Sequence, residues 1–199
     1  SWRLAGKLRE PSKLEARILE YFDRGSLEFI RPSFPRLPKE AEACLFIEQE
    51  ADAKSRPRLL EEWRQLFTKG GALDEIWEGQ TSGRREEFRQ FRSALPLAVK
   101  DFLAAHHQMK VGTDTCVPWE RFEELMTFHR RSVEKSNLPS VTFGHLGESH
   151  VHLNLLPRND EEAGKGRALY PELVKKAVEL GGSFSAEHGG GKLQRPYLS

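Results

Sequence analysis

Long apolar runs and cysteines are both scarce in this sequence of 199 residues, and each scarcity excludes a class of protein. No apolar stretch approaches the roughly 20 residues that a membrane-spanning helix needs. No charged start followed by an apolar segment marks a signal peptide. The two cysteines, Cys44 and Cys116, show neither a disulfide framework nor a metal-binding spacing. A reducing cytoplasm is therefore the simplest expected location.

An excess of charge of either sign is also missing. The chain has 31 basic and 30 acidic residues, which gives a formal net charge of +1. A nucleic-acid-binding domain needs a basic excess gathered on one face, so we expect no nucleic-acid partner. The length is enough for one domain with a sizeable core, or for two small domains.

Three histidines and an asparagine lie close together in residues 141–156, VTFGHLGESHVHLNLL. The pattern predicts a strand at residues 141–143, a glycine-marked turn at 144–149 and a second strand at 150–156. The two-residue period of a strand separates polar from apolar side chains on this second strand. One face carries His150, His152 and Asn154, and the other carries Val151, Leu153 and Leu155.

A second polar segment, GGSFSAEHGGGK, occupies residues 181–192, with a short strand predicted at 183–186. Imidazole and carboxylate groups are good ligands for zinc, manganese and iron(II). His145, His152 and Glu187 are therefore candidates for a three-ligand site with an open position, with His188 beside it as a group suited to proton transfer. The alternative is that these histidines are ordinary core or surface residues.

The rest of the chain alternates between strand and helix patterns. Further strands are predicted at residues 14–22, 43–48, 73–77 and 111–117. Helices are predicted at residues 25–30, 54–69, 82–95, 97–107, 118–135 and 161–180, with Pro96 as a break or kink and Asp160 as the last cap. A hairpin requires antiparallel pairing. We therefore predict an α+β fold, an antiparallel sheet flanked by helices, built as two ferredoxin-like units that share the sheet.

These motifs resemble the C-terminal domain of FAD-linked oxidases of the vanillyl-alcohol-oxidase type. The similar branch contains D-lactate dehydrogenases, the flavin subunit of glycolate oxidase and D-2-hydroxyglutarate dehydrogenase. The matching motifs are G-H-x-G-[DE]-x-[NH]-x-H-x-N at residues 144–154, S-A-E-H-G-x-G-K at 185–192, and R-x-x-x-P followed by T-D-x-x-V-P at 92–96 and 113–118. The resemblance covers the chain from about Leu14 onward.

The resemblance implies the substrate-binding (cap) domain of an FAD-dependent D-2-hydroxy-acid dehydrogenase. His188 would take the hydroxyl proton of the substrate while a hydride passes to the flavin. The other implied roles are metal binding by His145, His152 and Glu187, substrate binding by Arg92, Asn154 and His150, and cofactor binding by Gly189 and Gly191. Many relatives have Asp-Gly-Asn where this chain has Glu148, Ser149 and His150. The role of His150 is therefore open between metal ligand, substrate contact and neither.

The resemblance also implies that FAD is bound mainly by an N-terminal domain with no counterpart in this chain. That domain would come from the same gene product or from a partner subunit. Residues 1–13 are then expected to be a linker or a remnant of the preceding region. Residues 14–199 would form the C-terminal domain, truncated at its C-terminal end. We further expect a small 2-hydroxy-acid substrate, a homodimer formed through the uncovered flavin face, and a cytoplasmic location or peripheral attachment at the inner membrane.

Two other functions fit the same residues. One is a metal-binding or interaction module without catalysis of its own. The other is a free-standing metal hydrolase that uses His145, His152 and Glu187 with a bound water. The hydrolase leaves Arg92 and the order of the motifs unexplained.

Overall fold

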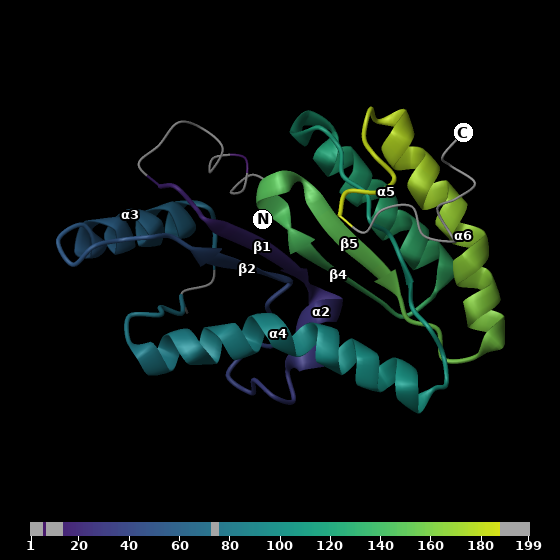
Figure 1. Ribbon diagram of the computed structural model, residues 1–199, viewed down its shortest axis with the longest axis horizontal. Helices are drawn as coiled ribbons and strands as arrows, with labels where there is room; N and C mark the ends of the chain where they lie inside the picture. Colours follow the sequence, from purple (N-terminus) through teal and green to yellow (C-terminus); the bar gives the residue numbers. More distant parts are fainter. Residues whose placement is uncertain (1–5, 7–13, 73–75, 188–199) are drawn as a thin grey trace.

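The computed structural model describes residues 6, 14–72 and 76–187. Within them the chain forms a five-stranded sheet in which every strand pair is antiparallel (Figure 1). The strand order is β2-β1-β4-β5-β3. The strands are β1 Ile18–Asp23, β2 Ala43–Glu48, β3 Val111–Gly112, β4 Ser140–His145 and β5 His150–Leu155.

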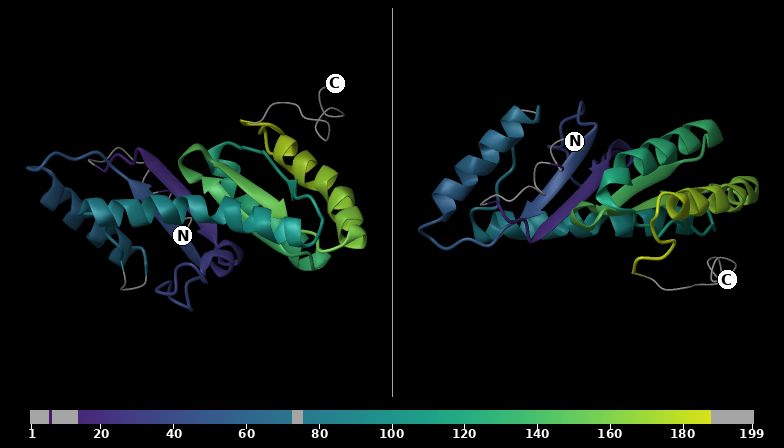
Figure 2. Two further views of the ribbon diagram at one scale, coloured as in Figure 1. Left: turned by 60° about the horizontal axis from the view of Figure 1, so that its bottom comes forward. Right: turned by 90° about the horizontal axis from the view of Figure 1, so that it is seen from above.

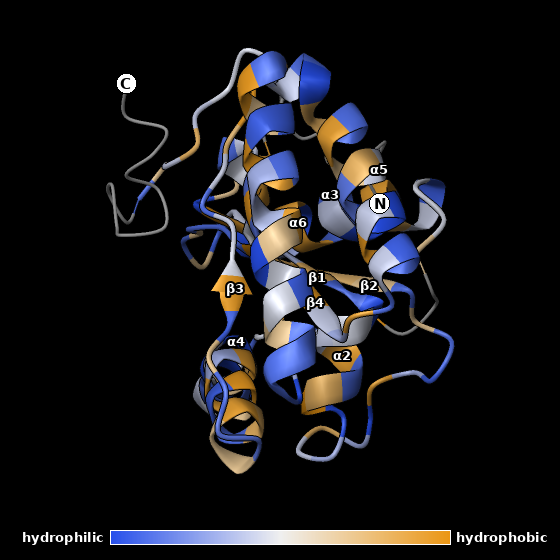
Figure 3. Cartoon of the chain, turned by 90° about the vertical axis from the view of Figure 1, so that its right-hand side faces the viewer, coloured by the Kyte–Doolittle hydropathy of each residue, from blue (hydrophilic) through white to orange (hydrophobic). Residues whose placement is uncertain are grey.

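Helices cover both faces of the sheet. The α-helices in the described residues are α2 Arg24–Ile30, α3 Arg56–Lys69, α4 Ser82–Ala105, α5 Trp119–Ser136 and α6 Asp160–Glu179. Figure 3 shows the sheet between α5 and α6 on one side and α2 and α4 on the other. Helix α3 lies beyond the β2 edge (Figure 2). The predicted α+β fold with an antiparallel sheet flanked by helices is confirmed.

The two faces of the sheet have separate apolar cores. Helices α5 and α6 pack on the face that carries Tyr21 and Val151. Helix α4 packs on the opposite face, which carries Phe22, Val141 and Phe143. Side chains alternate along a strand, so His145 projects from the same face of β4 as Phe143. His150 and His152 lie opposite His145 and Phe143 on β5, and directly opposed residues share a face. All three histidines therefore lie on the α4 face. The apolar packing under α4 thus gives way to polar groups at one end of this face.

Helix α4 continues through Pro96, whereas the sequence predicted two helices that meet there. A proline inside a helix removes one hydrogen bond and normally kinks or ends it. Here the buried side chains of α4 fall on both sides of Pro96: Phe91, Leu95, Val99 and Leu103. Burial of this continuous apolar stripe against the sheet offsets the local cost of the proline.

Three predicted strands are wrong or shorter than expected. The strand predicted at residues 111–117 is limited to Val111–Gly112, followed by isolated bridges at Asp114 and Cys116. Residues 183–186 form bridges to that segment and no regular strand. Of the strand predicted at 73–77, residues 76 and 77 are not in a strand and 73–75 lie outside the described residues.

The N-terminus of α6 is capped one residue earlier than predicted. The side chain of Asn159, not Asp160, accepts a hydrogen bond from the amide of Glu162. Asp160 instead lies in the first turn with two glutamates, where negative charge interacts favourably with the helix dipole. None of the described helices combines the length and apolar character needed to cross a membrane.

Candidate metal centre

Strand register places three ionisable groups in one row across the sheet. Glu20 on β1 lies opposite His145 on β4, and His145 lies opposite His150 on β5. Directly opposed residues of antiparallel strands project from the same face. His152 lies two residues further along β5 on that face. The sheet therefore gathers a carboxylate and three imidazoles without any contribution from a loop.

Gly144 makes room for the ring of His152. Its φ angle is +137°, a conformation that residues with a side chain rarely adopt. A Cβ atom at this position would lie 3.1 Å from the Cδ2 atom of His152. The glycine of the G-H motif thus has a packing role in this hairpin.

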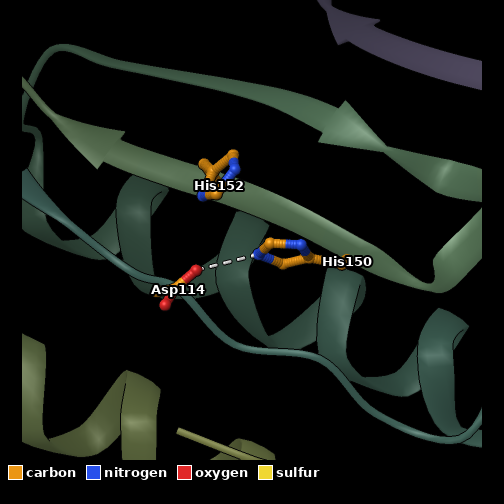
Figure 4. A group of neighbouring side chains, drawn as sticks. All are labelled: Asp114, His150 and His152. Carbon is orange, nitrogen blue, oxygen red and sulfur yellow. Dashed lines mark hydrogen bonds and ion pairs between the residues drawn. The ribbon is translucent and has the colours of Figure 1, made fainter. Parts of the chain in front are cut away.

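The segment that contains Thr113 and Asp114 runs beside β5 and fixes two histidines (Figure 4). The Nε2 atom of His150 donates to the Asp114 Oδ1 atom at 3.0 Å. The Nδ1 atom of His152 donates to the carbonyl oxygen of Thr113 at 3.3 Å. Thr113 is itself joined to β5 by bonds between its own backbone and side chain and the backbone of Leu153.

Asp114 also holds the segment that carries Glu187. Its Oδ2 atom accepts from the Ser185 hydroxyl at 2.9 Å and from the backbone amides of Ala186 and Glu187 at 3.2 Å each. The carboxylate is buried, with 3% of the residue exposed. One carboxylate therefore sets the position of His150 and of the chain around Glu187. The sequence alone did not predict the contact between Asp114 and His150.

The Glu187 carboxylate faces all three imidazoles. Its Oε1 atom lies 3.2 Å from His145 Nε2 and 3.7 Å from His150 Nδ1. Its Oε2 atom lies 3.9 Å from His152 Nε2. The predicted trio of His145, His152 and Glu187 thus converges, with one ligand atom from each within 4.8 Å of the others.

Each imidazole has a hydrogen-bond acceptor on the side away from Glu187. The acceptors on the far side are Glu20 for His145, Asp114 for His150 and the Thr113 carbonyl for His152. Carboxylate and carbonyl oxygens accept, so a neutral ring that donates to its outer acceptor presents the lone pair of its second nitrogen toward Glu187. Such outer partners are typical of metal-bound histidines, because they fix the ring orientation and the tautomer.

This arrangement suits a cation. Three lone pairs and a carboxylate repel one another unless positive charge lies among them, from a metal ion or from added protons. The donor set of imidazole nitrogens and a carboxylate oxygen is one that zinc, manganese and iron(II) accept. The residues therefore fit a divalent metal ion.

Glu20 is a member of the site that the sequence interpretation missed. It is 5% exposed, and its Oε1 atom accepts from His145 Nδ1 at 3.2 Å and from Arg92 Nη2 at 2.6 Å and Nε at 3.1 Å. A carboxylate within the otherwise apolar run of residues 18–22 was the available signal. Arg92, expected at the substrate carboxylate, is thus in the cluster but bonded to Glu20. Within the described residues its Nη1 group has no partner, and the side chain is 43% exposed.

The remaining predicted site residues are less informative. Asn154 is buried on β5 beside Gly112, where a Cβ atom would lie 2.6 Å from Asn154 Oδ1. Its Oδ1 atom has no hydrogen-bond partner in the part of the chain that the structure describes. His188, Gly189 and Gly191 lie outside the described residues.

Comparison with known proteins assigns a family to this antiparallel sheet with histidines and a glutamate at the end of one face. Residues 8–199 match the family described as FAD linked oxidases, C-terminal domain. The chain belongs to this family.

Individual proteins from bacteria and plants are also similar to this chain. The chain is 30% identical to the glycolate oxidase subunit GlcD of Bacillus subtilis over 193 residues, which cover 94% of this chain and 39% of that protein. It is 23% identical to the mitochondrial D-lactate dehydrogenase [cytochrome] of Arabidopsis thaliana over 94% of this chain and 33% of that protein. A D-lactate dehydrogenase of Anaerostipes hadrus is 26% identical over 81% of this chain and 35% of its own length. The chain therefore spans two-fifths or less of these relatives.

Proposed function

We propose that this chain is the substrate- and metal-binding domain of an FAD-dependent dehydrogenase of D-2-hydroxy acids. The observation that supports this most is the convergence of His145, His152 and Glu187, each imidazole backed by an outer acceptor. The relatives named for glycolate and D-lactate point to small 2-hydroxy acids as the substrate class. The family membership implies FAD, supplied with a second domain in the same gene product or a partner subunit.

The residues of this chain bind and orient the substrate in this proposal. A bound divalent ion would supply a Lewis acid next to the substrate hydroxyl, and bound FAD would supply the hydride acceptor. His145 and His152 would hold the ion through Nε2, and Glu187 through its carboxylate. His188 would take the hydroxyl proton, and Gly189 and Gly191 would let the chain approach the flavin.

Arg92 would bind the substrate carboxylate through the side of its guanidinium that Glu20 leaves open. The Nη1 group points away from two bonds that already fix the plane of the guanidinium. A pre-oriented arginine loses less conformational freedom when an acid binds. Asn154 would lie at the same face. A cytoplasmic location and a homodimer remain predictions.

The experiment is reduction of bound flavin by candidate substrates, measured anaerobically on the gene product or assembly that contains this chain together with its FAD-binding domain. Glycolate, D-lactate and D-2-hydroxyglutarate are the candidates, and L-lactate is the matched control. We expect bleaching of the flavin absorbance by at least one candidate and none by L-lactate. Arg92→Lys keeps the positive charge, but an ammonium group cannot bind a carboxylate through two parallel hydrogen bonds as a guanidinium does. The substrate KM should therefore rise more than kcat falls.

Two results would contradict the proposed function. A flavin that dithionite reduces but that no 2-hydroxy acid reduces would contradict the proposed substrate class. Tight binding of FAD by the 199-residue chain alone would contradict the assignment of the flavin site to a separate domain.

A further inference from the structure

We propose that Glu20 is the positioning residue of this site, and that its single carboxylate orients the metal ligand His145 and the substrate-binding Arg92 together. The inference rests on the proposed function, because both partners have their roles only there. It adds a residue that lies in none of the sequence motifs and that binds neither ion nor substrate itself.

Glu20 is buried in the middle of strand β1, between the apolar residues Leu19 and Tyr21. Its side chain is 6% exposed. A buried carboxylate is costly unless hydrogen bonds and an opposite charge compensate it. Here Arg92 supplies both, and strand register places His145 directly opposite Glu20 on β4. The carboxylate is therefore held by the two groups whose orientation it sets.

All three contacts of Glu20 with these groups are made by one oxygen atom. The Oε1 atom accepts from Arg92 Nη2 at 2.6 Å and from Arg92 Nε at 3.1 Å, and His145 Nδ1 lies 3.2 Å from it. The three residues come from β1, α4 and β4. One atom thus fixes the guanidinium relative to the imidazole, and a displaced carboxylate would release both.

His145 depends on an outer partner more than the other two histidines of the cluster do. Its side chain is 33% exposed, against 2% for His150 and 13% for His152. The segment beside β5 holds those two rings, whereas Glu20 is the outer partner of His145. A neutral His145 that donates from Nδ1 to Glu20 presents the lone pair of Nε2 to the ion.

Arg92 needs the same carboxylate for a different reason. Its side chain is 43% exposed, and a long side chain at the surface loses conformational freedom when it binds a ligand. Two hydrogen bonds to Glu20 fix the plane of the guanidinium before a substrate arrives. Glu20 also offsets part of the positive charge of Arg92, so its benefit to substrate binding is orientation and not attraction.

The first experiment measures the zinc Kd of the 199-residue chain by competition with a chelator. Glu20→Met keeps the length of the side chain and removes both acceptor oxygens. Glu20→Asp keeps the charge but draws the oxygen back by one methylene group. Glu20→Gln retains an oxygen that can accept from both partners, so it is the conservative variant. Glu123→Gln is the matched control, because Glu123 is exposed on α5, which covers the other face of the sheet.

Loss of an outer partner costs about 10–100-fold in metal affinity, so we expect Glu20→Met to raise the zinc Kd by about that factor. Glu20→Asp should also raise the Kd more than Glu20→Gln does, because the position of the oxygen is decisive. Glu123→Gln should leave the Kd unchanged. A Kd that is unchanged in both Glu20→Met and Glu20→Asp would overturn the positioning role.

The ring tautomer of His145 separates positioning from a merely structural role. The ¹⁵N chemical shifts of the ring in the metal-free chain report which nitrogen carries the proton, and His145→Gln assigns the signals. We expect the Nδ1–H form in the wild type and in Glu20→Gln, and loss of this preference in Glu20→Met. The same tautomer in Glu20→Met as in the wild type would overturn the role of Glu20 at His145.

The second experiment tests Arg92 by flavin reduction in the gene product or assembly that contains the FAD-binding domain, with zinc at a saturating concentration. Immobilising one long side chain on binding costs about 2–10-fold in affinity, so Glu20→Met should raise the substrate KM by about that factor and lower kcat less. An unchanged KM, or a lower one because the freed charge of Arg92 dominates, would overturn the role of Glu20 at Arg92.

These results are distinct from failure of the proposed function. Zinc binding by the wild-type chain that Glu20→Met and Glu20→Asp do not weaken would overturn this inference and leave the metal site in place. A wild-type chain that binds no zinc, or an assembly whose flavin no 2-hydroxy acid reduces, would overturn the proposed function and this inference together.

Discussion

Two buried histidines of this protein have opposite surroundings. His129 on α5 is 1% exposed and His150 on β5 is 2% exposed. Neither nitrogen of His129 has a hydrogen-bond partner in the described residues, and burial lowers its pKa to about 4. His150 is bound by Asp114 on one side and faces Glu187 on the other.

The comparison shows that burial alone does not mark a functional histidine. His129 shares the inward face of α5 with Phe122, Leu125 and Met126, so its neighbours along the helix are core residues. His150 is placed by strand register among charged and polar groups, with its tautomer fixed. The partners of a buried imidazole, more than its depth, indicate whether it serves packing or chemistry.

The largest expected effect on stability comes from His150→Leu, measured with a chelator present so that no metal contributes. The substitution leaves the buried Asp114 carboxylate without its imidazole. Removing one partner of a buried hydrogen bond costs about 1–3 kcal/mol, and more where the group left behind is charged. We expect the free energy of unfolding to fall by about 3 kcal/mol. The loss is limited because Asp114 keeps its hydrogen bonds from the Ser185 hydroxyl and from the amides of Ala186 and Glu187. Urea denaturation would measure the change in the free energy of unfolding. A loss below about 1 kcal/mol would contradict a stabilising role for the pair of Asp114 and His150.

The second effect is the pH dependence that His129 contributes. Its folded-state pKa of about 4 is below the unfolded value near 6.5, so the unfolded chain binds more protons between these values. Stability therefore falls as the pH is lowered through this window and is regained as the pH rises. Between pH 7 and pH 5 the contribution is about 2 kcal/mol. The wild type should lose that much more stability than His129→Leu, and equal losses in the two proteins would contradict the assignment.

The third effect has the opposite sign to the first. His129→Leu replaces a buried imidazole, whose nitrogens have no partner among the described residues, by an apolar side chain of similar size. Removal of an unsatisfied buried polar group should raise the free energy of unfolding by about 1 kcal/mol at pH 7. Thermal and urea denaturation would both report it. Destabilisation by His129→Leu would show that the imidazole has a partner of importance.

The smallest effect separates the two histidines by function. His129→Leu should change the zinc Kd by less than about threefold, because distant and independent sites contribute additively. Competition for zinc with a chelator provides the measurement. A larger change in the zinc Kd in His129→Leu would contradict this prediction, because it would show that the core around α5 affects metal binding.

The hairpin was predicted from local patterns, although β4 is longer than the predicted residues 141–143 and includes His145, which was expected in the turn. Glycine punctuation and the two-residue period located β4, β5 and the polar face of β5, and these patterns depend on near neighbours in the chain. The strand at residues 43–48 was also predicted within its observed bounds. The continuation of α4 through Pro96 was not predictable locally, because it depends on a buried stripe that crosses the proline.

The candidate site was predictable in its motif residues and not in their outer partners. His145, His152 and Glu187 stand in recognisable motifs, and the structure brings them together. Glu20 lies 125 residues before His145, and Asp114 lies 36 residues before His150. Such contacts follow from strand register, which a single sequence does not specify for distant strands. The bond between Arg92 and Glu20 was hidden because it depends on how helix α4 packs against strand β1, 72 residues away in the chain.

The most direct test of the central claim is the metal content of the purified 199-residue chain after incubation with zinc and dialysis, measured by elemental analysis for the wild type and for His152→Ala. We expect about one zinc ion per wild-type chain and almost none in the variant, because His152 supplies one of the converging nitrogen atoms. Equal zinc content in the two proteins, or none in either, would contradict a metal centre at His145, His152 and Glu187.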